Sequence, residues 1–444
     1  MDTIHPADLE IIRQAYKRWD EIALTRALRE TFFQYAQGAS VEEWVRFVFG
    51  RGPAPAVSTV PHRLYVDSME KTLRWLNGDR PDVPAARGRS PKEWEFIADV
   101  KGVPHWELPF FLNQMMLRDL EPRRQAALVG TMRNDGIYIL EWVAHHKALG
   151  FEHIFIYTND NQDGSDALLG ILADHGLITV IENEITGQVE PEAKAFGHAL
   201  NLLHDLRDFE WVMFLDSDEY FVPAPRFERS VSTVLSELSN AHPDGRAAAV
   251  LYDWLWFVSD MAMRRTPGTL YERFEHVRPH WLSKTLVRLP DVLSMRCQHH
   301  PEMRDGMVVV DSNFDPVDMQ KIWQRRTSQY AGGSTHHYWP KSFEEFLVKK
   351  ARGATLTMAQ NFFNRPYQTF FQWNGYATPD NRYALDPLLR DAVAAQIAEL
   401  RAIPGVAAAA AQIDAEFSDV ARTLSGVADI EALYAQYRVE PGPL

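Results

Sequence analysis

WVMFLDSDE, residues 211–219, begins with five apolar residues and contains three carboxylates at its end. An apolar run of this length is typical of a strand buried on both faces, as in a parallel sheet covered by helices. Ligands of open α/β sheets collect at the carboxyl ends of the strands. Asp216 and Asp218 would stand there, where carboxylate oxygens can hold a divalent cation against substrate phosphates. The alternative is a strand that ends in a solvated acidic turn. The segments before it favour the metal.

The chain before residue 211 alternates strand-like and helix-like segments, which is typical of a parallel sheet. The predicted elements are strand 126–132, helix 137–148, strand 153–158, helix 167–175, strand 177–181 and a helix that begins at Pro191. No glycine-rich phosphate loop follows the first strand, because residues 130–136 match neither G-x-G-x-x-G nor a Walker sequence. The pattern therefore favours diphosphate binding through a metal over a dinucleotide or P-loop enzyme.

Composition sets outer limits on the protein class. The chain has 444 residues, 46% hydrophobic and 24% charged, which is ordinary for a soluble globular protein. Its net charge of −14 argues against a general nucleic-acid binder. A single cysteine, Cys297, excludes an intrachain disulfide framework and favours a reducing compartment. With no signal-like N-terminus and no apolar run near ~18 residues, we expect a cytoplasmic protein, with peripheral membrane association left open.

Three regions are expected along the chain. Residues 1–120 read as a helical and mixed N-terminal region without a catalytic motif, and residues 121–375 hold the α/β domain. Residues 376–444 return to helical periodicity, for example at Leu389, Val393 and Ile397, and would form a helical appendage. The sequence does not specify an oligomeric state.

Four blocks of the sequence, taken in order, resemble a known group of enzymes. They are TMRNDGIYILEWVAHH (131–146), LGFEHIFIYTNDNQDGS (149–165), FLDSDEYF (214–221) and the segment from His337 to Gly353. Together they resemble bacterial glycosyltransferase family 2-like proteins and glycosyltransferase family 92, over about residues 126–355. The resemblance implies a GT-A-like fold, a nucleotide-sugar donor, a hydroxyl acceptor such as a glycan, and a divalent metal, Mn²⁺ or Mg²⁺.

The resemblance also implies roles for individual residues. Asp216 and Asp218 would hold the metal, and His337 would be a further ligand. The residues implied or expected to bind the donor are Thr131, Arg133, Asn134, Asn159, Asp160, Lys194, Ser217, Lys284, Lys341 and Arg352. Two departures from the usual pattern occur: Asp135 replaces a glutamate, and Phe196-Gly197 stands where related sequences often carry Tyr-Asn, which puts a polar contact from that helix in doubt.

Other candidates have structural alternatives. His336 neighbours His337, and in a strand only one of the two would face the site; the motif favours His337. Lys341, Lys349, Lys350 and Arg352 lie close together on a helical stretch, and one or two of them could neutralise a leaving diphosphate, although such charges usually mark a solvated helix face. His299 and His300 form a second pair, which could belong to a polar loop near the site or bind the acceptor or the metal. Trp254, Trp256 and Phe257 could form a sugar platform, and core packing is the favoured interpretation for them.

The predicted function is metal-dependent transfer of a hexosyl group, with inversion at the anomeric carbon, in the synthesis of a surface or secreted polysaccharide. An inverting reaction needs a carboxylate that takes the acceptor proton, and Asp260 and Glu302 are the candidates. Two alternatives stay open. One is a catalytically silent protein on the same fold that binds a nucleotide sugar or a glycan. The other is a sugar nucleotidyltransferase, which would need the glycine-rich loop that is missing.

Overall fold

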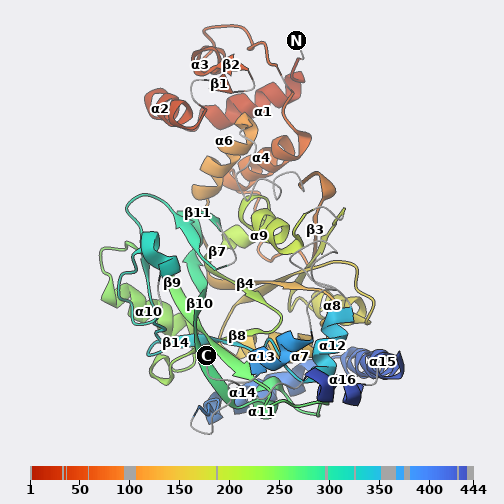
Figure 1. Cartoon of the computed structure of the whole chain (residues 1–444). Coiled ribbons are helices and arrows are strands. Elements are labelled where there is room, and N and C mark those ends of the chain that lie inside the picture. Colours follow the sequence, from red (N-terminus) through yellow and green to blue (C-terminus); the bar gives the residue numbers. More distant parts are fainter. Residues whose placement is uncertain are drawn as a thin grey trace.

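The computed structural model has one large mixed sheet at its centre with helices on both sides (Figure 1). It describes residues 3–32, 35–36, 38–58, 60–94, 107–186, 189–295, 299–324, 327–351, 367–374, 381–427 and 430–437. The sheet has ten strands, and its main path runs β3-β6-β5-β4-β7-β10-β9-β14-β8, with β13 paired to β9. This arrangement confirms the predicted α/β class and is that of a GT-A-like fold.

Five neighbouring strands form the parallel half of the sheet. They are β3 (Arg87–Ser90), β6 (Thr179–Asn183), β5 (His153–Thr158), β4 (Arg124–Met132) and β7 (Phe209–Asp216). Side chains of β7 alternate between two hydrophobic cores: Val212 and Phe214 pack on one face, and Met213 and Leu215 on the other. Burial on both faces is the reason that this strand reads as a continuous apolar run.

The other half of the sheet is mixed in direction. It consists of β10 (His276–Arg288), β9 (Ala247–Val258), β14 (Gly333–His337), β8 (Glu219–Pro223) and the short β13 (Val308–Val310). Strand β10 is antiparallel to both β7 and β9, whereas β14 runs parallel to β9 and antiparallel to β8. Strand β14 therefore brings His337 back to the edge at which β7 ends.

Helices cover both faces of the sheet. The face with Met213 is covered by α7 (Gly136–Ala148), α8 (Ser165–Asp174) and α10 (Val231–Ala241), and the face with Phe214 by α9 (Pro191–Asn201). Short helices α11 (Leu270–Arg273), α12 (Phe343–Ala351) and α13 (Gln368–Asn374) lie near the carboxyl ends of the strands. A separate hairpin pairs β11 (Val292–Met295) with β12 (Pro301–Met303).

The N-terminal region forms a helical unit with its own core, at the α9 end of the molecule (Figure 1). Its elements are α1 (Pro6–Tyr16), α2 (Glu21–Phe32), β1 (Tyr35–Ala36), β2 (Ala39–Ser40), α3 (Val41–Val48), α4 (Arg63–Leu76) and α6 (Leu108–Arg118). The unit is tied to the α/β domain by a buried contact of 3.0 Å between Thr72 Oγ1 and His204 Nε2. In addition, β3 comes from this region of the chain, which the sequence analysis did not predict.

The C-terminal region is helical, in agreement with the periodicity of the sequence. It contains α14 (Pro387–Ala402), α15 (Val406–Val427) and α16 (Ile430–Tyr437). Leu389 and Val393 of α14 join the core that covers α7. Among the described helices, none is by itself long and apolar enough to cross a membrane; α14 and α15 meet that test of length and composition only together, as a pair bent by 102°.

Candidate active site

The indole N–H of one tryptophan hydrogen-bonds to the backbone of the turn that follows β7. The Trp142 indole Nε1–H of α7 lies 3.0 Å from both the Asp216 and the Glu219 carbonyl oxygens, which flank the turn. The indole reaches this place over Gly130 of β4, where an added Cβ would lie 2.7 Å from the ring of Trp142. Gly130 of β4 and Trp142 of α7 therefore set the position of Asp216 and Asp218.

Asp216 faces a buried acidic cluster built around one lysine. Lys284 Nζ, on β10, lies 3.2 Å from Asp216 Oδ2, 3.1 Å from Glu219 Oε2 and 3.9 Å from Glu192 Oε1. Burial by itself would lower the pKa of Lys284, but the surrounding carboxylates raise it above its ordinary value. Burial raises the pKa of Glu219 to about 8, although Lys284 acts against this shift. The cluster thus holds more acid than base, and Lys284 is the group that compensates it.

Asp218 lies in the opposite electrostatic environment. Its Oδ2 lies 3.2 Å from Lys341 Nζ and 2.7 Å from Lys349 Nζ, and its Oδ1 lies 3.6 Å from His337 Nε2. Burial would raise the pKa of Asp218, but the two ammonium groups and the imidazole hold it well below its ordinary value. Burial also lowers the pKa of Lys341 to about 8. The predicted proximity of His337 to Asp218 is confirmed.

The two neighbouring histidines face opposite sides of the sheet, as strand geometry requires. The His336 ring packs against Phe257 and Tyr383, with centroid distances of 4.8 and 4.6 Å, while His337 turns toward Asp218. The choice of His337 over His336 as the residue that faces the site is therefore correct in its geometry.

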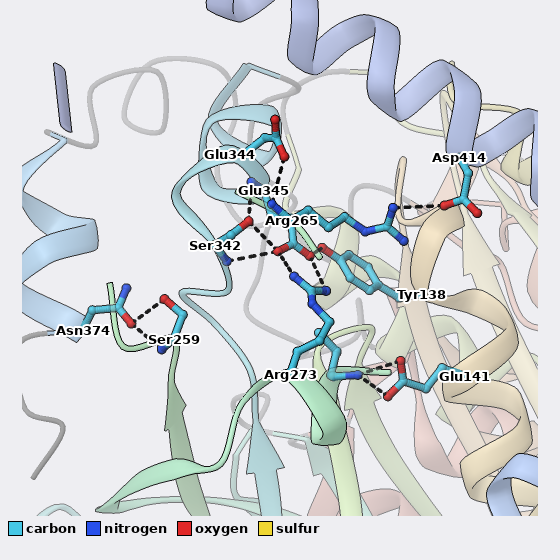
Figure 2. A network of polar contacts seen from close by, with 11 residues as sticks. Tyr138, Glu141, Ser259, Arg265, Arg273, Ser342, Glu344, Glu345, Asn374 and Asp414 are labelled. Carbon is cyan, nitrogen blue, oxygen red and sulfur yellow. Dashed lines mark hydrogen bonds and ion pairs between the residues drawn. The ribbon is translucent and has the colours of Figure 1, made fainter. Parts of the chain in front are cut away.

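A buried network fixes the segment that carries the two lysines (Figure 2). Glu345 accepts hydrogen bonds from the Ser342 backbone N–H at 3.0 Å and hydroxyl at 2.6 Å, from the Tyr138 hydroxyl at 2.8 Å, and from the Arg273 guanidinium. Lys341, just before it, has a φ of 51°, in the left-handed region that non-glycine residues rarely adopt. Such strain persists only where the surroundings enforce it, so the network holds Lys341 in place above Asp218.

The loops after β4 and β5 are bonded to each other. The Asn134 N–H donates to Asn161 Oδ1 at 2.8 Å, and the Gln162 N–H donates to Asn134 Oδ1 at 2.6 Å. Asn159 is half-buried, and its side chain donates to the exposed Asp160 at 3.0 Å. These loops stand at the carboxyl ends of neighbouring parallel strands, which is the place predicted for a nucleotide.

The other predicted donor-binding residues differ in how closely they approach the turn. Thr131 is the β4 register partner of Asp216, Arg133 is half-buried one residue beyond the end of β4, and Ser217 lies buried in the turn itself. Lys194 is fully buried, and its ammonium donates to the carbonyls of Ser90 and Glu184. This places Lys194 in a structural role at the ends of β3 and β6. Arg352 lies outside the described residues.

The two candidate bases lie apart from each other. Asp260 follows β9, has a φ of 50°, and is hydrogen-bonded to His276 Nδ1, with 45% of its side chain exposed. Glu302 sits on the separate β11–β12 hairpin, where it accepts a bond of 3.1 Å from the Ser294 hydroxyl. In the described part of the chain, neither forms a hydrogen bond or ion pair with Asp218.

The side chains at the turn suit a cation that arrives with a phosphate ligand. Asp218 and His337 offer a carboxylate oxygen and an imidazole nitrogen, which Mn²⁺ accepts. Asp216 is paired with Lys284 and Asp218 with Lys341 and Lys349, and over the described ranges no three His, Cys, Asp or Glu side chains are grouped to hold a metal. Sites of the nucleotide type use one or two carboxylates plus substrate phosphates, so an ion at this turn would have to take most of its ligands from a substrate.

A cavity of about 740 Å³ lies elsewhere, between the start of α7, the 264–269 segment and α15. Two arginines of its wall form ion pairs: Arg264 with Glu344 at 3.2 Å, and Arg265 with Asp414 at 3.1 Å. The second pair is shown in Figure 2. Since its lining includes neither the 216–219 turn nor His337, we place the candidate site at the strand ends.

Sequence reasoning missed several residues that position the site. Glu345 follows Ser342 by three residues, the spacing of a capping box, so this signal was present in the sequence. Glu192 offers no comparable signal, because a glutamate in the first turn of a helix is common. Its approach to Lys284 depends on how two distant elements pack.

Comparison with known proteins matches residues 132–361 to the family model of glycosyltransferase family 92. A glycosyltransferase family 92 protein of Ricinus communis is 31% identical over 101 residues, which make up 23% of this chain and 18% of that protein. Another, from Oryza sativa subsp. japonica, is 27% identical over 149 residues, 32% of this chain and 23% of that protein. The aligned segments thus span less than a quarter of either relative. The family match includes Asp218, His337 and both lysines of the site.

Proposed function

Since the chain belongs to glycosyltransferase family 92, we propose that it transfers a sugar from a nucleotide-sugar donor to a hydroxyl group of an acceptor. The observation that carries the proposal is the surroundings of Asp218. Two lysines and a histidine converge on one buried carboxylate at the end of β7, beside the loops that follow β4 and β5. This is the edge at which α/β sheets bind nucleotides.

The lysines supply what the departing group needs. When the bond between the anomeric carbon and the diphosphate oxygen breaks, negative charge grows on the nucleoside diphosphate. Fixed cations placed at that position stabilise the transition state. Lys341 and Lys349 are such cations, and the Glu345 network keeps them from relaxing away. In this proposal the excess positive charge around Asp218 marks the diphosphate subsite.

A divalent cation belongs to the same proposal. Asp218 and His337 would hold it, with Asp216 near them, and the donor diphosphate would complete its ligands. When bound, such an ion offsets diphosphate charge as a Lewis acid. The lysines next to Asp218 would then act on the phosphate oxygens that the ion leaves exposed.

We propose transfer of a hexosyl group with inversion at the anomeric carbon. The acceptor oxygen bonds to that carbon from the face opposite the leaving diphosphate, and a carboxylate takes the acceptor proton. Asp260 is favoured over Glu302, because it follows β9 at the edge where β14 ends and its carboxylate is oriented by His276. The product would be a polysaccharide or another glycan.

The test is a panel of nucleotide sugars assayed with the full chain, Mn²⁺ and mixed oligosaccharide acceptors. Acceptor-dependent release of nucleoside diphosphate is expected from the wild type and not from Asp218→Asn. Lys350→Met serves as a control. This lysine lies on α12 next to Lys349, but its ammonium stacks on Tyr367, whereas that of Lys349 pairs with Asp218. Tight metal-dependent nucleotide binding without transfer across the panel would favour a silent binding protein, and no nucleotide binding at all would reject the proposal.

A further inference from the structure

Four tryptophans gather beside His337 on the mixed half of the sheet. We call them the tryptophan cluster: Trp254 and Trp256 of β9, Trp339 just after β14, and Trp373 of α13. The His337 ring lies 4.3 Å from the Trp254 ring and 4.8 Å from the Trp256 ring, between centroids. Trp256 in turn stacks on Trp373 at 4.9 Å and on Trp339 at 6.0 Å. The cluster is therefore continuous with the residue that faces Asp218.

Two indole nitrogens of the cluster and one nitrogen of His337 lack the partners that buried groups normally have. Among the described residues, Trp254 Nε1, Trp256 Nε1 and His337 Nδ1 are shielded from solvent and have no hydrogen-bond partner. Buried indole N–H groups usually find an acceptor, and Trp142 shows this nearby with two carbonyls. Three unpaired nitrogens next to the candidate reaction centre point to a ligand that offers several hydroxyl groups.

Two rings of the cluster are more exposed than the other two. Trp254 and Trp256 are 7% and 4% exposed, whereas Trp339 and Trp373 are half-buried. The Arg278 guanidinium lies 5.5 Å from the Trp256 ring centroid and 4.9 Å from that of Trp373. A rim of half-buried rings and one stacked cation, with unpaired donors behind it, is the chemistry of a subsite that takes an apolar ring face and its hydroxyls.

The location within the sheet assigns the subsite to the acceptor rather than the donor. The loops expected to bind the nucleotide follow β4 and β5 in the parallel half, whereas the cluster belongs to β9, α13 and the segment after β14. Strand β7, which Asp218 follows, lies between β4 and β9 in the sheet, and the His337 ring contacts both Asp218 and the cluster. A donor that spans Asp218 from the parallel side would direct its sugar toward His337 and the cluster.

We propose that the tryptophan cluster is the acceptor subsite and that the acceptor is a carbohydrate, held by ring stacking on the half-buried tryptophans and by hydrogen bonds to the unpaired nitrogens. This inference rests on the proposed function, because it names the acceptor of that reaction. Since the inner nitrogens are shielded from solvent, the proposal requires the rim side chains to shift when an acceptor binds.

The experiment measures acceptor binding directly. The full chain, with Mn²⁺ and UDP or GDP present, is titrated calorimetrically with maltotetraose, cellotetraose, mannotetraose and galactotetraose, and in parallel with a serine-rich peptide and a long-chain alcohol. At least one oligosaccharide is expected to bind. Trp254→Phe and Trp256→Phe, which mainly remove one N–H each, are expected to weaken it about fivefold.

The matched control is Trp94→Phe. Trp94 is also fully buried, and its Nε1 has no hydrogen-bond partner among the described residues, but it lies in a separate cluster with Tyr65 and Phe110. This variant is expected to leave oligosaccharide affinity unchanged. Trp373→Leu, at the half-buried rim, tests the stacking contact if an inner variant does not fold.

Several outcomes overturn the inference while the proposed function stands. They are nucleotide binding with no oligosaccharide binding, binding of the peptide or the alcohol instead, and equal losses in the Trp94 and Trp254 variants. Absence of nucleotide binding in the wild type would reject the proposed function itself, so the two failures are separable.

Discussion

Asp216 and Asp218 are two positions apart in the sequence, yet their surroundings are opposite in charge. Around Asp216, the Lys284 ammonium forms salt bridges with three carboxylates. Around Asp218, two ammonium groups and an imidazole serve one carboxylate. The Asp216 side is therefore saturated with acid and suited to holding the turn, whereas the Asp218 side has cationic charge to spare for an anionic ligand.

The difference shows how a short acidic motif is divided between structure and chemistry. The motif itself is local, but the groups that distinguish its two carboxylates come from β10 and α9 on one side and from β14 and α12 on the other. Four experiments test this division.

The largest effect is expected for Lys284→Met. Lys284 is the only cation that the described residues place in this cluster, so its removal leaves buried carboxylates uncompensated, which lowers the free energy of unfolding by about 3–5 kcal/mol. Urea unfolding measures the loss. Lys349→Met is the matched control, because its ammonium is 24% exposed and Lys341 remains beside Asp218; a similar loss in both variants would contradict the division.

His337→Ala is expected to reduce transfer activity about 100-fold, in the range of a lost transition-state contact, while the protein stays folded. His336→Ala removes a ring on the opposite face of the sheet, so it should lower the melting temperature and leave kcat near that of the wild type. Steady-state kinetics and thermal unfolding of both variants give the comparison. A larger kcat loss in the His336 variant would place the chemistry on the wrong face.

Lys349→Met is expected to weaken binding of a nucleoside diphosphate about tenfold, since a charge-assisted contact is removed. Calorimetry with UDP and GDP at two salt concentrations measures this, and the salt dependence should decrease in the variant. Lys350→Met, one residue along the same helix, should bind like the wild type. Equal affinities in all three proteins would remove Lys349 from the diphosphate subsite.

The smallest effect concerns the pH dependence of stability on the Asp216 side. The folded-state pKa of Glu219 is raised to about 8, above the ~4.3 of an unfolded glutamate, so the native state keeps a proton that the unfolded chain has released. Stability from this group is present at low pH and declines as pH rises from about 4 to 8. Glu219→Gln should make the unfolding free energy less dependent on pH over that window, and an unchanged slope would argue against the raised pKa.

The sequence predicted the parallel half of the sheet better than the rest. The strand at 153–158 coincides with β5, and the helix from Pro191 begins as predicted, because these segments carry strong period and boundary signals. Strand β3 was missed, since Arg87–Ser90 has no apolar residue to reveal it. It is recognisable only through its register with β6.

The candidate site divides in the same way. Asp216, Asp218 and the choice of His337 followed from local motifs, and their expected proximity is confirmed for Asp218 and His337. The Lys284–Glu192 approach and the Arg273–Glu345 pair depend on packing between distant elements. No local pattern encodes such pairs, so a single sequence does not reveal them.

The insertion of β14 between β9 and β8 has a consequence for synthesis on the ribosome. Strand β8 follows the acidic turn directly, yet within the described strands it pairs only with β14, which lies more than a hundred residues later in the chain. Until Gly333–His337 emerge, the nascent domain exposes an edge of β8 and the part of β9 around Trp254 to Trp256, since β13 pairs with β9 only around residues 247–250. Unpaired strand edges can pair with other chains. The growing polypeptide therefore passes through an aggregation-prone intermediate, which ends when β14 inserts.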